Sequence, residues 1–449
     1  MSGSPLSRWT MSYFAAALVF LLAGLALMAG GFGFPANAVE APDTLVVVHL
    51  IAVGWLCLLF CGALLQFVPV LTASEARLGR LAAPALLSIV GGLAMLVAGF
   101  LAMGGHVGVP SSIMLPGAFL LMAGLGVLAL SFVLTILGET RPGLSSILVT
   151  FGLAGLTATA LLGTGFAAAL SGLFDSAFLD GLLPAAIPFH GAFGLLGWMT
   201  VTAIGVSYRL FSMFVLAPEA TASARRVALS ASAALLGGLA ALSAALFSGG
   251  GVAWAVSLLA VALACLLACL YLSDIAAMFR ARRRRQLELN SQAGVVALAF
   301  LAAGLIALAA GQFLETAWPV TPAAFYLLAM GWLTGLGLAQ LYKIIPFLTW
   351  LEGYGPVMGK TAVPRVQDLV SERVARKWFV LYFASVALAS ALMLAGMPTG
   401  FRIAAVLQFI AVAGLGLEYV RARRLSYAPE ALRLPAGARR PHLIYAAYG

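Results

Sequence analysis

The sequence predicts an all-α polytopic membrane protein with twelve transmembrane helices, and three observations support this. First, the 449 residues are 63% hydrophobic and only 9% charged, whereas soluble domains are about half apolar and a quarter charged. Second, twelve spans of roughly 20 apolar residues with short connections use nearly the whole chain, so no length remains for a separate soluble domain. Third, the basic residues fall almost entirely on one side of that arrangement.

The expected spans are the apolar runs between polar breaks. They belong to one transmembrane domain, residues 1–449, and cover 12–32, 44–70, 81–103, 114–137, 146–171, 183–208, 227–248, 252–273, 293–311, 321–345, 378–397 and 401–420. The longest connection, residues 349–377, is expected to be a loop whose second half lies along the lipid headgroups as an interfacial helix.

The basic residues orient these spans, because cytoplasmic connections of membrane proteins are enriched in Lys and Arg. With the N-terminus inside, only Arg402 of the 25 basic residues lies in an outer segment. We therefore expect both termini to be cytoplasmic in a membrane of the bacterial inner-membrane type. The net charge of +10 is then a topology signal and not a sign of nucleic-acid binding. The run from Arg282 to Arg285 is expected to contact membrane lipid.

A Gly-Trp pair recurs in spans two, six and ten. The three pairs are Gly54-Trp55, Gly197-Trp198 and Gly331-Trp332, and a long polar residue follows each at the same offset, namely Gln66, Arg209 and Lys343. Agreement at several offsets and an even spacing in helix number indicate an internal repeat. The repeat predicts three pseudo-equivalent four-helix arcs at about residues 1–140, 141–290 and 291–425, with a cytoplasmic tail at 426–449.

Two of these spans contain a histidine near their outer ends. The strings are His49-Leu-Ile-Ala-Val-Gly54-Trp55 and Phe189-His190-Gly-Ala-Phe-Gly-Leu-Leu-Gly197-Trp198. Together with the three arcs, they make the chain resemble the haem-copper oxidase subunit I superfamily, including its cbb3-type, nitric-oxide-reductase-type and NnrS-type relatives. That resemblance implies an axial haem ligand at the position of His49 and a copper ligand at the position of His190.

The chain departs from that family where the oxidase site should be. The resemblance implies a His-x-His in span ten and a histidine pair in span seven, and neither span contains a histidine. The four histidines of the chain include His106 in an outer loop and His442 in the tail, so a six-histidine dinuclear site cannot form. Reduction of oxygen or nitric oxide by the family mechanism is excluded, and an enzymatic role is not expected.

The two intramembrane histidines are the main candidate site, since an ionisable group inside a span is costly and usually functional. Their offsets from the following tryptophans differ by two residues, or about 200° around a helix. His49 and His190 therefore either converge on one cavity or diverge. If they converge, two imidazoles in an apolar pocket suit a b-type haem, with Met330 as an alternative second ligand. Otherwise each neutral ring satisfies a backbone carbonyl across helices.

The four cysteines form two Cys-x-x-x-Cys pairs on helical faces, one of which lies in the same span as His49. Soft thiolates select copper(I), so Cys57 and Cys61 are weaker candidates for a copper site. The alternative is that these buried thiols act as small hydrophobic side chains.

These observations favour a degenerate oxidase-like protein that keeps one haem or metal site near the outer leaflet. Its expected roles are redox-gas response, haem or copper handling, or assembly, with a membrane or redox protein as partner. No Asp or Glu lies in the middle of a span, which disfavours a proton pump. The alternative is a small-molecule secondary transporter without a cofactor, although such proteins are usually built from two related halves.

Overall fold

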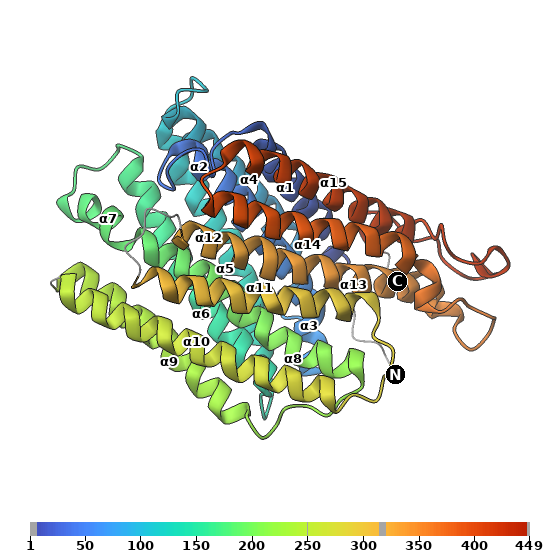
Figure 1. Cartoon of the computed structure of the whole chain (residues 1–449). Helices are drawn as coiled ribbons and strands as arrows, with labels where there is room; N and C mark the ends of the chain where they lie inside the picture. Colours follow the sequence, from blue (N-terminus) through green and yellow to red (C-terminus); the bar gives the residue numbers. More distant parts are fainter. Residues whose placement is uncertain (1–6, 249, 314–319, 447–449) are drawn as a thin grey trace.

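The structure, a computed structural model, describes residues 7–248, 250–313 and 320–446. Within these residues, twelve helical segments are long and apolar enough to cross a membrane, as the sequence predicts (Figure 1). The protein is therefore an all-α integral membrane protein. The uninterrupted spans are α1 (Thr10–Gly30), α4 (Ala82–Met103), α5 (Met114–Ile136), α6 (Leu144–Leu170), α9 (Ala224–Phe247), α10 (Gly250–Arg280), α11 (Leu289–Gly311), α14 (Glu372–Leu394) and α15 (Pro398–Arg423).

Spans two, six and ten each consist of three consecutive helical segments. They are α2 (Pro42–His49), η1 (Leu50–Cys57) and α3 (Leu58–Thr72); α7 (Ala177–Ala192), η4 (Phe193–Thr200) and α8 (Val201–Val215); and α12 (Val320–Tyr326), η5 (Leu327–Thr334) and α13 (Gly335–Tyr354). Spans two and ten are the most deeply placed, because 72% of their most apolar stretch is buried, against 17% for the eighth span. Figure 1 shows α9 and α10 at the edge of the bundle.

The middle segments η1, η4 and η5 are π-helices of eight residues each. In all three, the repeated Gly-Trp pair occupies the fifth and sixth positions, and each segment contacts the other two. Since π-helical turns are rare and concentrate at functional sites, the equivalence of these spans extends from sequence to backbone geometry. The tryptophans fill the centre, each no more than 1% exposed, and are Trp55, Trp198 and Trp332.

The glycine of two of these pairs allows a neighbouring helix to approach. A Cβ on Gly54 would lie 2.6 Å from the ring of Phe20 in α1, and one on Gly331 would lie 2.5 Å from the ring of Phe300 in α11. In each case the partner belongs to the span that precedes the inner helix. The repeat therefore encodes close packing of an inner helix on its predecessor, as small residues do in membrane bundles.

Two inner spans are longer than expected. The sixth runs from Ala177 to Val215 instead of 183–208, and the tenth from Val320 to Val357 instead of 321–345. Polar residues that suggested an end of the helix are held inside the bundle. Tyr208, for example, is buried and donates a hydrogen bond of 2.7 Å to Asp274 in α10.

The expected loop at 349–377 is largely helical, which corrects the sequence analysis. Helix α13 continues to Tyr354, a 3₁₀ turn covers Val366–Leu369, and α14 begins at Glu372. No separate interfacial helix forms in this described segment. The extended helix α13 includes Glu352, which is buried in an ion pair with Arg423 (2.9 Å).

The tail from residue 426 lies across the ends of α1 and α13. Tyr354 donates to the carbonyl of Arg433 (2.6 Å), and the backbone N–H of Arg439 donates to the carbonyl of Gly353 (2.9 Å). The N–H of Ala446 reaches the carbonyl of Arg8 (2.8 Å), so the two described chain ends meet at one end of the bundle. The tail is thus part of the fold.

Candidate functional site

Local sequence fixes where each candidate histidine lies. Helix α2 begins with Pro42 at its first turn, where proline is preorganised, and His49 is the last residue before η1. Helix α7 contains Pro184 and Pro188, which remove backbone hydrogen bonds and bend a helix; His190 lies close to its end, just before η4. Both histidines therefore precede the π-helical segment of their span, at the end opposite the chain termini.

The two imidazoles converge. Their ring centroids lie 6.5 Å apart and their planes differ by 28°. The sequence left convergence and divergence open, and the structure brings His49 and His190 together between spans two and six. Met330, the alternative partner named from sequence, lies further along span ten inside η5.

Each imidazole is oriented by a backbone carbonyl. Nδ1 of His49 lies 2.8 Å from the carbonyl oxygen of Leu45 in its own helix, and Nδ1 of His190 lies 3.1 Å from that of Thr159 in α6. A neutral imidazole that donates from Nδ1 keeps its Nε2 lone pair free. In the described part of the chain, neither Nε2 has a hydrogen-bond partner. Carbonyl-oriented histidine with a free Nε2 is the usual arrangement of a metal ligand.

An apolar ring packs beside each imidazole, and both histidines are half-buried. The ring of Phe100 in α4 lies 5.0 Å from that of His49, and Phe166 in α6 lies 5.4 Å from His190. Gly163 lies under His190, where a Cβ would be 2.9 Å from the ring carbon Cε1. Phe193, the first residue of η4, is directed to Gly238 of α9.

The spacing fits two ligands on opposite sides of one metal. A metal–imidazole nitrogen bond of about 2.0 Å, added to the radius of each ring, places the two centroids roughly 6.3 Å apart, close to the observed 6.5 Å. The two imidazoles do not hydrogen-bond to each other, because each Nδ1 meets a backbone carbonyl and, among the described residues, neither Nε2 has a partner. The pair therefore fits an axial ligand set.

The donor set also discriminates between metals. Among the described residues, no group of three or more His, Cys, Asp and Glu side chains is arranged to hold a metal ion. Structural zinc sites use four protein ligands and catalytic ones three, so two imidazoles alone do not complete such a site. A haem brings four ring nitrogens of its own and needs only axial ligands from the protein.

The cysteine candidates lie deeper in the same span. Cys57 ends η1 and Cys61 follows in α3, and both are free thiols with at most 4% of the residue exposed. They do not join His49 in a metal-binding group of the kind just described. The residues from Leu50 to Cys57 form a π-helix, so the rotation per residue between His49 and Cys57 differs from that of an α-helix.

Sequence reasoning missed one polar pair near the site. Nε2 of His106, in the outer loop, lies 2.8 Å from Oδ1 of Asp43, which is in the first turn of α2. Asn37 also donates to the other oxygen of Asp43 at 3.3 Å. The pair ties the loop after α4 to the helix that carries His49. No spacing signal links residues so far apart in sequence.

No family model matches this chain, and no curated protein matches it. The resemblance to the oxidase superfamily therefore stays an expectation from sequence, and the fold and site described above are the evidence for function.

Proposed function

We propose that this membrane protein binds one b-type haem between His49 and His190 and acts in redox response or in haem handling, without an oxidase site. The observation that carries the proposal is the convergence of two imidazoles at 6.5 Å, each oriented through Nδ1. A bound haem supplies one-electron redox chemistry. A redox protein in or at the membrane is the proposed partner.

The residues of the chain would do three things for such a group. His49 and His190 would hold it from both sides, and the carbonyls of Leu45 and Thr159 would fix the tautomer and orientation of those rings. Phe100 would contribute to an apolar wall that excludes water. The burial of a haem and the identity of its axial ligands are two of the factors by which a protein sets the haem's reduction potential.

The test is the absorption spectrum of the purified protein and of single histidine variants. The full chain, expressed with ample haem supply, should show the sharp reduced bands of a six-coordinate low-spin b-type haem. His49→Ala and His190→Ala should each open an axial position, so the haem becomes high-spin or is lost. His442→Ala is the matched control, because that side chain is exposed in the tail, at the end of the bundle opposite the pair, and its spectrum should equal that of the parent.

Two outcomes would contradict the proposal. A protein that takes up no haem would leave the cofactor-free transporter as the better account. A protein whose haem responds to only one of the two histidine variants would have a different second ligand, for which Met330 is the candidate.

We also infer that both chain ends are cytoplasmic. The support is the one-sided distribution of basic residues, together with the meeting of Ala446 and Arg8 at one end of the bundle. A cytoplasm-dependent reporter fused to the C-terminus should be active. Activity of a periplasm-dependent reporter at the same position would reverse the orientation.

A further inference from the structure

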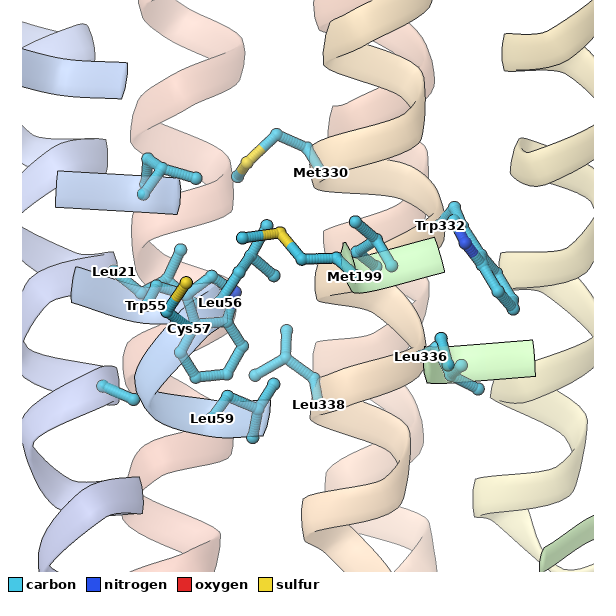
Figure 2. Close-up of a cluster of buried hydrophobic side chains, with 14 of the residues drawn as sticks. Leu21, Trp55, Leu56, Cys57, Leu59, Met199, Met330, Trp332, Leu336 and Leu338 are labelled. Carbon is cyan, nitrogen blue, oxygen red and sulfur yellow. The ribbon is translucent and has the colours of Figure 1, made fainter. Parts of the chain in front are cut away.

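Three sulfur-bearing side chains occupy the centre of the bundle, one from each π-helical segment. Cys57 comes from η1, Met199 from η4 and Met330 from η5, and at most 4% of each residue is exposed. In Figure 2, the side chains of Met199 and Met330 extend from their helices toward the side where Cys57 lies, and the Cys57 sulfur is turned toward them. Because the three segments contact one another, these side chains share the region between the inner helices.

A buried donor lies near the thiol. The indole N–H of Trp198 is buried and makes no hydrogen bond of ordinary geometry within the described residues. Its ring packs 5.9 Å from that of Phe60, which follows Cys57 by three residues in the same span. A buried donor without an acceptor is costly, and an indole N–H can only donate. A thiolate sulfur at Cys57 would give it a charged acceptor, and charge-assisted hydrogen bonds are the stronger kind.

We propose that Cys57, Met199 and Met330 form a binding site for a single copper(I) ion, distinct from the histidine pair. Thiolate and thioether sulfur are soft ligands that select copper(I). On binding, the Cys57 S–H bond breaks, a sulfur–copper bond forms, and the proton leaves to the medium. No electron is transferred, because the metal enters as copper(I).

Charge also favours a monovalent ion at this depth. The segments η1, η4 and η5 contain no charged residue, so nothing nearby compensates a surplus charge. One thiolate, two neutral thioethers and copper(I) sum to zero, whereas a divalent ion in the same site leaves one uncompensated positive charge. Burying an unpaired charge in a low-dielectric interior is strongly unfavourable, so the site discriminates against zinc and other divalent ions.

The test measures copper bound to the full chain in detergent. Copper(I) is added under a reductant, a copper(I) chelator is used as competitor, and retained metal is determined by elemental analysis. The parent should retain about one copper per chain, since the site has one thiolate. Three variants, Cys57→Ser, Met199→Leu and Met330→Leu, should each lower the affinity for copper by at least roughly tenfold. Changing a residue that only supports a metal ligand already lowers metal affinity by about 10- to 100-fold.

Matched controls separate metal loss from misfolding. Met393→Leu changes another buried methionine, in α14 and outside the three π-helices, and Cys265→Ser removes a thiol of the second pair; both should retain copper like the parent. Methionine-to-leucine changes conserve volume and are tolerated best in cores, so the methionine variants should melt near the parent's temperature.

X-ray absorption at the copper edge supplies a spectroscopic readout. Sulfur-only coordination in the parent, and loss of that signal in Met199→Leu, is the expected result. The proposal is overturned if the parent binds no copper, if the three variants retain it as the parent does, or if the ligands are imidazole nitrogens. The haem proposal is read from the haem absorption spectrum of the His49 and His190 variants, so one assignment can fail without the other.

Discussion

Replacing Gly163 by alanine tests how tightly the site is built, because it leaves both proposed ligands in place. The added methyl carbon would lie 2.9 Å from Cε1 of His190, 3.6 Å from Nδ1 and 3.9 Å from Nε2. Carbon atoms pack at about 3.5–4.0 Å, so the ring must retreat by roughly 0.6 Å. Functional constellations tolerate displacements of only about 0.5 Å.

The expected result is weaker haem binding with a net loss of stability of at most about 2 kcal/mol. We expect haem affinity to fall roughly 10- to 100-fold, as it does when residues that position a metal ligand are changed. The helix gains about 1 kcal/mol from alanine, which offsets part of the roughly 1–3 kcal/mol cost of overpacking. The assay is haem retention per chain after gel filtration, with the melting temperature measured in parallel.

The matched control is Gly126→Ala in α5. A Cβ at Gly126 meets no atom within 4 Å, so this variant should keep its haem and gain stability of up to about 1 kcal/mol. If Gly163→Ala binds haem as the parent does, with an unchanged spectrum, the position of His190 does not matter to the site and the reasoning is refuted.

Two further predictions concern the end of the bundle where the termini meet. Glu352→Ala leaves Arg423 without its buried ion partner and should cost about 3–5 kcal/mol. Arg365→Ala, which breaks an exposed pair, should leave the melting temperature close to that of the parent; thermal unfolding in detergent compares the two variants. Burial opposes the charge of Glu288, but the hydrogen bond and charge of Lys343 and the charge of Arg284 outweigh it and hold the pKa of Glu288 below its usual range. Its contribution to stability should therefore be present above the unfolded-state pKa of about 4.3 and disappear as pH falls through the lower folded-state value; equal acid sensitivity of Glu288→Gln and the parent would contradict this.

The sequence was sufficient for the number of spans and for the equivalence of spans two, six and ten, because long apolar runs and a repeated Gly-Trp pair are local signals. It did not predict the π-helical form of η1, η4 and η5. That form depends on tertiary packing, such as the contacts of Gly54 with Phe20 and of Gly331 with Phe300.

The sequence was enough to identify the two histidines of the candidate site, but not to predict how they are arranged. The offset of His49 and His190 from the tryptophans gives a rotation about each helix axis but not which neighbour each face meets, so convergence needed the structure. Phe100 and Phe166 come from other spans and carry no signal that links them to the pair. Likewise, no sequence signal marks Met199, which becomes a candidate ligand only because η4 contacts the other two π-helices in the structure.

The most direct test of the central claim is the electron paramagnetic resonance spectrum of the oxidised, haem-loaded protein. Two imidazoles on one ferric iron should give a low-spin signal, and planes that differ by only 28° should give its rhombic form instead of the highly anisotropic form typical of perpendicular rings. A high-spin signal, or a low-spin signal that persists unchanged in both His49→Ala and His190→Ala, would contradict the assignment of this histidine pair.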